Sequence, residues 1–254
     1  MKTEVFLSGG SVLPEDVRGR TVIVIDVLRA STTIATALSH GARSVIPVGN
    51  MEEAGKMVAN LDPSSYRLGG ERDGVPIQGY HFGNSPREYT PESIGDRTLI
   101  LLTTNGSGAI VRCAEAAEVL VGGFVNATAV AGRALRAGRD VVIVCAGWRN
   151  RISLEDTLCA GLLLELIWQG DRPESMTDSA YIAWTLYQAD RQDLLRPVSR
   201  CNHAKRLEKL GYAEDIPICV VVDSIPLVPV YRDSQLVRLD DPTPESVGVD
   251  AAIG

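Results

Sequence analysis

Three short apolar segments, each followed directly by a loop of small or polar residues, constrain the fold of this chain more than any other feature. They run over Thr21–Ile25, Thr98–Leu102 and Asp140–Cys145, and their apolar positions do not alternate with polar ones. A strand covered on both faces of a parallel sheet has this continuous pattern, because neither face meets water. Helical periodicity follows each loop, at about residues 32–39, 107–116 and 154–168.

The rest of the chain continues this alternation of strands and helices. Further strands are predicted at residues 44–48, 119–124 and 218–222. Further helices are predicted at residues 51–60, 127–137, 178–188 and 203–210. The alternation predicts an α/β protein with a three-layer α/β/α arrangement, in which a mostly parallel or mixed sheet lies between two layers of helices.

Two parts of the chain repeat the same order of elements at nearly the same spacing. Each contains a strand, a turn, a helix and a second strand, and an asparagine then opens a further helix. From the start of the first strand to that asparagine there are 29 residues (50 − 21) in one part and 28 residues (126 − 98) in the other. We therefore predict two similar βαβ units. At 254 residues a single domain over 1–254 is expected, and two intertwined halves at about 1–97 and 98–254 remain an alternative.

Residues 67–97, between the two similar parts, are rich in glycine, proline and polar side chains and have little periodicity. This pattern predicts a long segment without regular structure, which in a compact domain usually serves a function. Glu71 and Asn84 lie in its two most turn-rich stretches, which carry charges of both signs. We expect these stretches to close over a site or to supply ligands to it.

Charge and hydropathy argue against large anionic or lipid partners. Lys and Arg number 25 and Asp and Glu 32, so the formal net charge is −7 and we expect no nucleic-acid partner. No segment approaches the ~18 uninterrupted apolar residues of a membrane span, and residues 1–10 lack the apolar stretch of a signal peptide. The expected location is therefore the cytoplasm, without membrane contact.

The five cysteines indicate reduced, buried thiols. Their number is odd, they form no CxxC pair, and most of them lie in apolar segments. The single hint of a zinc site is the stretch from Cys201 to His203, and the role of these two residues stays open.

The loop after the first strand combines groups that bind a metal ion and an anion. Asp26 ends the strand, Arg29 supplies a planar fork of donors, and Ser31 and Thr32 lie where the amides of a helix start favour an anion. The alternative is that Ser31 only caps the helix and that Arg29 is a surface charge. We favour the functional interpretation, because a carboxylate that ends an apolar strand needs a partner.

The loop after the second strand is small and rich in hydroxyl groups. Its glycines let the backbone approach a phosphate or carboxylate closely. An ordinary capped turn is the alternative. The candidate ligand groups of this loop belong to Thr103, Thr104, Asn105 and Ser107.

The loop after the third strand contains Arg151, Ser153, Glu155 and Asp156. Ser153 and Asp156 have the spacing of a capping box, although Asp stands where Glu or Gln is usual. Capping does not explain Arg151 or Glu155, so we retain both as candidates for an active site.

Four carboxylates from these segments form an all-oxygen set of metal-ligand candidates: Asp26, Glu71, Glu155 and Asp156. Mg²⁺ is bound in proteins by one or two carboxylates together with water and substrate oxygens. The sequence contains no GxxxxGK[ST] motif, no GxGxxG after the first strand and no GxSxG motif. The set therefore favours a magnesium site that handles a small anionic substrate.

Nine short motifs follow one another along the chain: Asp26–Ile34, Gly70–Arg72, Gly83–Pro86, Thr103–Ser107, Cys145–Gly147, Ser153–Asp156, Cys159–Gly161, Ser199–Leu210 and Val228–Pro229. Together, and in this order, they resemble the 2-phosphosulfolactate phosphatase family. The resemblance extends over about residues 20–231 and implies a three-layer α/β fold. It also implies a Mg²⁺-dependent phosphatase that converts (R)-2-phospho-3-sulfolactate to sulfolactate and phosphate, a step in coenzyme M biosynthesis. Residues 148–150 depart from the family, which more usually has a small, glycine-containing sequence there.

For this reaction we expect Asp26, Arg29 and Glu155 to be catalytic and the substrate to be a small anionic phosphoester. Two mechanisms stay open for Asp26. It holds the metal while water attacks phosphorus, or it attacks phosphorus itself. We prefer the first, because Leu28 stands where phosphatases of the haloacid-dehalogenase type have a second aspartate. Substrate contacts are expected from Ser31, Thr32, Asn84, Thr103, Thr104, Asn105, Ser107, Arg151 and Ser153.

Two other functions remain alternatives. The same machinery would serve the phosphate ester of another small hydroxy acid, and a protein of this fold could also bind a small organic anion without catalysis. A homodimer is also left open.

Overall fold

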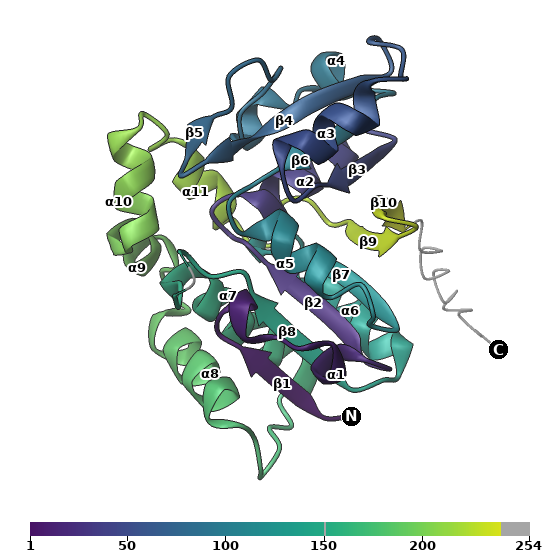
Figure 1. Cartoon of the computed structure of the whole chain (residues 1–254). Coiled ribbons are helices and arrows are strands. Elements are labelled where there is room, and N and C mark those ends of the chain that lie inside the picture. The colour runs from purple at the N-terminus through teal and green to yellow at the C-terminus, as the bar shows by residue number, and fades with distance from the viewer. Residues whose placement is uncertain (150, 240–254) are drawn as a thin grey trace, which may run out of the picture.

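A computed structural model of the chain describes residues 1–149 and 151–239, which fold around one mixed sheet (Figure 1). The strands of the described residues are β1 (Thr3–Phe6), β2 (Thr21–Ile25), β3 (Ser44–Pro47), β4 (Tyr66–Arg72), β5 (Val75–Pro76), β6 (Thr98–Leu102), β7 (Glu118–Gly122), β8 (Val141–Cys145), β9 (Val228–Arg232) and β10 (Gln235–Leu239).

The sheet consists of two parallel groups of strands joined by an antiparallel hairpin. Its order is β1-β8-β2-β7-β9-β10-β3-β6-β4-β5. The group β1, β8, β2, β7 is parallel within itself, and so is the group β3, β6, β4. The three contacts made by β9 and β10 are antiparallel, so the two groups run in opposite directions. In Figure 1 the first group lies in the lower part of the molecule and the second in the upper part.

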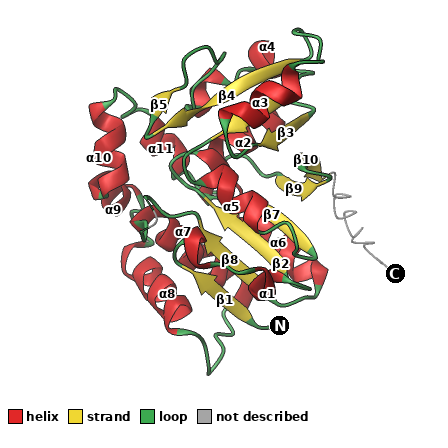
Figure 2. Cartoon of the chain, in the orientation of Figure 1, coloured by secondary structure: helices red, strands yellow, loops and turns green. Residues whose placement is uncertain are grey.

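Helices cover the sheet, as Figure 2 shows in red. The α-helices are α1 (Pro14–Val17), α2 (Ala30–Ser39), α3 (Met51–Val58), α4 (Pro91–Ile94), α5 (Gly106–Arg112), α6 (Ala127–Ala137), α7 (Leu154–Trp168), α8 (Asp178–Asp190), α9 (Leu195–Arg200), α10 (Asn202–Lys209) and α11 (Asp215–Cys219). Three short 3-10 helices are η1 (Gly9–Ser11), η2 (Pro86–Glu88) and η3 (Phe124–Asn126).

The buried side chains of the strands divide between helices on opposite faces. Ile23 and Ile143 pack with α6, α7 and α8 on one face of the first strand group. Val24, on the other face, packs with Leu101 and with helices α2 and α5. In the second strand group, which contains β6, Ile100 packs with side chains of α3. The predicted α/β fold with a mixed sheet between helices is thus confirmed.

Most predicted elements are present, with small shifts at their ends. The strands at 21–25 and 98–102 and the helices at 127–137 and 154–168 have the predicted bounds. The helix predicted at 107–116 is shorter and ends at Arg112.

The two parts that repeat the same order of elements do not occupy separate regions of the sheet. β2 pairs with β7 and β8, whereas β3 pairs with β6 and β10. Each part therefore contributes one strand to each parallel group.

The prediction of a strand at residues 218–222 is wrong. This region contains the end of helix α11 and a turn. Asp215, Ile216 and Cys219 are buried, a spacing that belongs to one face of a helix, while Val221 and Val222 are exposed. The apolar residues here thus follow the period of a helix and not that of a strand.

The prediction that residues 67–97 lack regular structure is also wrong, because they contain most of β4 together with β5, η2 and α4. The glycines that hid β4 are required by its packing. A Cβ on Gly70, whose φ is +143°, would lie 2.0 Å from the carbonyl oxygen of Leu102, and one on Gly69 would lie 2.2 Å from the hydroxyl of Tyr89. The backbone of Leu102 and the hydroxyl of Tyr89 therefore leave no room for a side chain at these two positions.

Besides β4 and β5, three strands were not predicted: β1 at the sheet edge and the two strands of the hairpin, β9 and β10. The hairpin turn consists of Asp233 and Ser234, which both have positive φ (49° and 62°). Two positive φ values at the centre of a two-residue loop are the conformation that joins twisted antiparallel strands.

Candidate active site

The loops after β2, β6 and β8 converge on one pocket, although β2 and β6 belong to strand groups of opposite direction. The turn after β4 and helix α10 complete the lining of this pocket, and α10 lies at the left of Figure 1. The pocket is narrow, with a cavity volume of about 10 Å³. Its lining residues are Asp26, Leu28, Arg29, Glu71, Asp73, Gly74, Asn84, Thr104, Asn105, Trp148, His203 and Leu207.

Asp26 lines this pocket and is 7% exposed. Burial raises the pKa of its carboxyl group to about 6. The positive charge of His203 acts in the opposite direction, and the negative charges of Glu71 and Glu155 raise the pKa further. A carboxylate in these surroundings favours a cation as a neighbour.

Gly106, the first residue of α5, leaves the space that the carboxylate of Asp26 occupies. A Cβ on this glycine would lie 2.7 Å from Oδ2 of Asp26 and 2.7 Å from Cβ of Ala30. Any larger residue must therefore displace Asp26 or the start of α2.

We predict that Gly106→Ala lowers kcat by about 10²-fold, because a shift of about 1 Å in a reacting group is enough for such a loss. Steady-state kinetics measure the effect, and circular dichroism checks that the fold is retained. Gly108→Ala is the matched control, since a Cβ there meets no atom within 4 Å. Equal activity of the two variants would show that the position of Asp26 does not matter for turnover.

Glu71 joins the turn after β4 to the loop after β6. Its Oε1 accepts a hydrogen bond from the backbone N–H of Thr104 (2.7 Å), and its Oε2 accepts bonds from the N–H of Gly74 (2.6 Å) and the hydroxyl of Thr104 (3.0 Å). These bonds hold a second carboxylate in the wall of the pocket that contains Asp26.

Arg29 is buried, so the alternative that it is a surface charge is wrong. Its side chain is 2% exposed, and its Nη1 lies 2.6 Å from Oδ2 of Asp215, which is fully buried. The side chain lines the pocket and brings a guanidinium group to it. Sequence reasoning missed Asp215, which follows Arg29 by 186 residues.

Asn84 presents an oxygen atom without a partner. Its side chain is 4% exposed and lines the pocket, and its Oδ1 forms no hydrogen bond with any described residue. Buried polar groups in proteins are almost always hydrogen-bonded, and an exception in a pocket wall indicates a ligand. Asn84 therefore belongs with Asp26 and Glu71 as an oxygen donor for a bound cation or substrate.

Glu155 reaches the site through His203. Its Oε1 lies 3.1 Å from Nδ1 of His203, whose ring stacks on Trp148 with a centroid distance of 5.7 Å. Burial acts to raise the pKa of Glu155, but the hydrogen bond and the charge of His203 outweigh it and the pKa lies below its ordinary value. The sequence alone indicated no role for His203. In the structure His203 contacts Glu155 and lines the same pocket as Asp26, which indicates a role in the site.

A second cavity, of about 210 Å³, adjoins the first and shares Trp148 and His203 with it. Glu155 and Ser153 line this second cavity. Asn150, one of the residues that depart from the family pattern, lies outside the described residues.

Asp156 connects two of the loops. Its Oδ1 accepts a hydrogen bond from the N–H of Val27 (2.9 Å) and its Oδ2 from the N–H of Gly147 (3.0 Å). Burial raises its pKa well above the ordinary range, and the charges of Glu155 and Asp26 add to this. Both oxygens are thus bonded to the backbone, and Asp156 lies outside the pocket lining.

Several predicted binding groups bond to the backbone. Ser31 is not the N-cap of α2; its hydroxyl accepts a bond from the N–H of Asp26 (2.9 Å). Thr103 and Ser107 accept bonds from each other's N–H groups (3.1 and 2.9 Å). Arg151 is exposed. The predicted residues absent from the linings of both cavities are Ser31, Thr32, Thr103, Ser107, Arg151 and Asp156.

Ser153 caps helix α7 and accepts a hydrogen bond from the N–H of Asp156 (3.3 Å). The carboxylate of Asp156 bonds elsewhere, so only this half of the expected capping box forms. Cys201 is the N-cap of α10, where its sulfur accepts from the N–H of Ala204. Among the described residues, no three His, Cys, Asp or Glu side chains are gathered closely enough to hold a metal ion by themselves.

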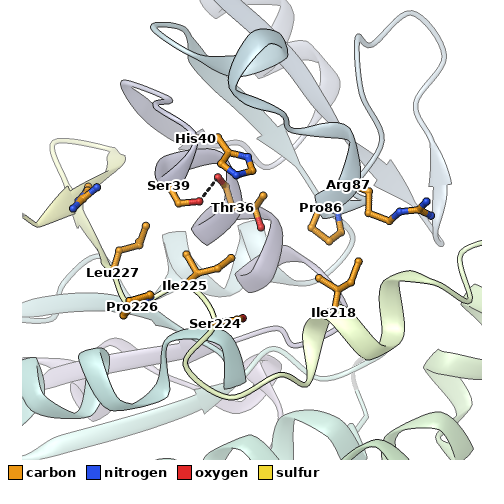
Figure 3. Close-up of a pocket in the computed structure, with 11 residues that line it drawn as sticks. Thr36, Ser39, His40, Pro86, Arg87, Ile218, Ser224, Ile225, Pro226 and Leu227 are labelled. Atoms are coloured by element: carbon orange, nitrogen blue, oxygen red, sulfur yellow. Dashed lines mark hydrogen bonds between the residues drawn. The ribbon is translucent and has the colours of Figure 1, made fainter.

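A larger cavity lies elsewhere, between α2, η2 and the loop that precedes β9 (Figure 3). It has a volume of about 530 Å³ and is lined by apolar side chains such as Ile218, Ile225 and Leu227. The described residues of its lining include no carboxylate. It therefore lacks the oxygen ligands of the smaller pocket.

Within the described residues, no helix has the length and apolar character needed to cross a membrane. The longest of the site helices, α7, has 15 residues and begins with Glu155 and Asp156.

Comparison with known proteins gives a consistent result. Residues 10–234 match the family model for 2-phosphosulpholactate phosphatase. A probable 2-phosphosulfolactate phosphatase of Symbiobacterium thermophilum is 39% identical over 226 residues, which are 89% of this chain and 97% of that protein. Proteins with the same name from Caldanaerobacter subterraneus (38% over 225 residues; 88% of this chain and 92% of the relative) and Clostridium acetobutylicum (36% over 236 residues; 93% and 100%) match similarly.

Proposed function

Because the chain belongs to the 2-phosphosulpholactate phosphatase family, we propose that it hydrolyses 2-phosphosulfolactate to sulfolactate and inorganic phosphate. One observation in particular supports this proposal. The pocket joins the oxygens of Asp26, Glu71 and Asn84 with the buried guanidinium of Arg29. We extend the proposal to the pathway that the sequence resemblance implies, the biosynthesis of coenzyme M.

Charge balance supports Mg²⁺ as the cofactor. The proposed substrate carries phosphate, carboxylate and sulfonate groups, while Asp26 and Glu71 add negative charge and Asp215 pairs with Arg29. The donors would be the carboxylates of Asp26 and Glu71 and the unpartnered Oδ1 of Asn84, an all-oxygen set that suits a hard cation. When bound, Mg²⁺ would neutralise charge on the phosphoryl oxygens and act as a Lewis acid.

The remaining groups of the pocket have complementary roles in the proposed reaction. The N–H donors of Arg29 bind phosphoryl oxygens, whose negative charge increases as phosphorus is attacked. Glu155 fixes the orientation of the His203 ring through Nδ1. The imidazole of His203, and not the carboxyl group of Glu155, therefore donates the proton to the leaving oxygen. Asp156, with both oxygens on backbone N–H groups, holds the loops after β2 and β8 together.

Release of inorganic phosphate tests the proposal directly. The purified protein with Mg²⁺ is assayed in parallel on 2-phosphosulfolactate, phosphoglycolate and the phosphoglycerates. We expect the highest kcat/KM on 2-phosphosulfolactate, by at least about 10-fold, because a lost charged contact costs on the order of 1.4 kcal/mol or more. A higher kcat/KM on another ester would assign the site to that hydroxy acid. No release from any ester would leave a binder of organic anions.

A further inference from the structure

The guanidinium of Arg29 is held in place by groups from the far end of the chain. Arg29 is the N-cap residue of α2, and its side chain is almost completely buried (2% exposed). Its Nη1 lies 2.6 Å from Oδ2 of Asp215 in α11, whose side chain is 0% exposed. A buried charge is stable only next to an opposite charge. The guanidinium of Arg29 can therefore lie in the pocket wall only because Asp215 pairs with it.

Two further contacts fix the orientation of this pair. The hydroxyl of Ser85 donates a hydrogen bond to Oδ1 of Asp215 (2.7 Å), so both oxygens of that carboxylate are in use. The ring of Tyr212 lies against the guanidinium, with Cζ of Arg29 4.3 Å from the ring centroid. A carboxylate at one edge and an aromatic face against the plane restrict both the tilt and the rotation of the guanidinium.

The arrangement divides the donors of Arg29 between two tasks. A guanidinium has five N–H donors in one plane. Asp215 accepts a hydrogen bond from Nη1. The side chain also lines the pocket next to Asp26 and Asn84. Asp215 itself does not line the pocket, so it acts on a ligand only through Arg29.

We propose that Asp215 is a positioning residue for phosphate-ester hydrolysis, which together with Ser85 and Tyr212 aims the free edge of the Arg29 guanidinium at the phosphoryl group. The inference rests on the proposed function. It assigns a role in the reaction to α11 and to the turn before it, which carry no residue of the predicted active site.

The first experiment compares Tyr212→Leu with the conservative Tyr212→Phe. Leucine removes the aromatic face, and we expect kcat to fall about 10-fold with KM changed less than about threefold, since a small misorientation affects the transition state most. Phenylalanine keeps the ring face and is expected to restore kcat to within about twofold of the wild type. A purely structural role for Tyr212 would change stability in both variants and leave kcat alone.

The second experiment removes the charge of Asp215. Asp215→Asn keeps an oxygen for Arg29 and a similar shape, and we expect kcat to fall about 10²-fold, as for loss of one oriented donor. Ser85→Ala, which leaves the ion pair intact, is the milder variant should Asp215→Asn fold poorly, and it is expected to lower kcat about fivefold or more. The effect on kcat is compared with the midpoint of thermal unfolding.

Glu118→Gln is the matched control for loss of a buried carboxylate. Glu118 pairs with Arg133 and Arg139 at the start of β7, at the opposite end of the strand from the site loops. Its variant is expected to unfold at a lower temperature with kcat unchanged. If Ser85→Ala and Tyr212→Leu behave in the same way, Asp215 and its partners are structural only and the inference is overturned.

Binding of inorganic phosphate, measured by calorimetry on each variant, separates this inference from the proposed function. If the wild type neither hydrolyses 2-phosphosulfolactate nor binds phosphate, the proposed function is wrong and the inference falls with it. If the wild type is active and the Ser85 and Tyr212 variants match its kcat and its affinity for phosphate, only the inference is wrong.

Discussion

Asp26→Asn is expected to lower kcat by at least about 10³-fold, because it removes the carboxylate on which both candidate mechanisms depend. The same substitution is expected to raise the midpoint of thermal unfolding at about pH 7.5. Asp26 is buried near Glu71 and Glu155, and its pKa in the folded protein is about 6 against an ordinary value of 3.8. Ionisation of this group therefore destabilises the fold at neutral pH.

The sign of the pH dependence follows from these two pKa values. Between about pH 4 and pH 6 the folded protein binds more protons than the unfolded chain, so this group lowers the stability as the pH rises through that window. Above about pH 6 Asp26 is ionised in both states and the loss of stability is complete. Below about pH 4 Asp26 is protonated in both states and the stability is not reduced. The difference in unfolding midpoint between Asp26→Asn and the wild type should accordingly be greatest above pH 6 and vanish at low pH, without added metal.

Asp140→Asn is the matched control for these measurements. Asp140 lies at the start of β8, at the end of the strand away from the site, where it accepts a hydrogen bond from the N–H of Lys2. Its substitution should leave kcat unchanged. An Asp26→Asn variant that retains more than about a tenth of the wild-type kcat would remove Asp26 from the catalytic residues.

Loss of activity in Asp26→Asn does not distinguish a metal-holding carboxylate from a nucleophile. Acid quench of a single turnover with ³²P-labelled substrate makes that distinction. We expect no label on the protein, as for attack by water on phosphorus. A stoichiometric, hydroxylamine-labile phosphoprotein that is absent from Asp26→Asn would assign the attack to Asp26 instead.

Exhaustive chelation is expected to abolish turnover, and activity should return with Mg²⁺ or Mn²⁺ to a higher level than with Ca²⁺. The oxygen donors Asp26, Glu71 and Asn84 suit hard cations, and three protein oxygens completed by water fit the six-ligand shell of Mg²⁺ better than the six to eight ligands of Ca²⁺. Phosphate release measured before and after treatment with EDTA tests this. Full activity of the chelated enzyme would contradict the proposed cofactor.

Thermal unfolding gives a readout of metal binding that does not depend on catalysis. A ligand at 100 times its Kd stabilises the folded state by about 2.7 kcal/mol, so Mg²⁺ should raise the unfolding midpoint of the wild type by several degrees. Asp26→Asn should show little of this increase. An equal shift in both proteins would indicate that the cation binds elsewhere.

Local sequence patterns were informative wherever nearly all residues of an element are buried. The strand at 21–25 and the helix at 154–168 have the predicted bounds because every residue of the strand, and most of the helix, is buried. Where two structures compete for the same apolar residues, the pattern was misleading. Residues 218–222 read as a strand, yet burial of Ile216 and Cys219 on one side makes their region helical.

The candidate site could be predicted only in part, for a related reason. A carboxylate at the end of a buried strand requires an explanation from sequence alone, and this identified Asp26. Nothing near Arg29 in the sequence indicates that Asp215, 186 residues later, is its partner. The hydroxyl groups of Thr103 and Ser107 have the composition of a binding loop, but they form hydrogen bonds within the loop itself.

Residue identity and local spacing were enough to predict the α/β class, the family and most of the helices, together with five of the strands of the sheet. The tertiary structure alone decided the direction of the two strand groups and the joining hairpin of β9 and β10. It also decided which buried charges meet, as in the pairs Arg29–Asp215 and Glu155–His203. The physical reason is that periodicity reports how deeply a side chain is buried, whereas its partner depends on which distant segment packs against it.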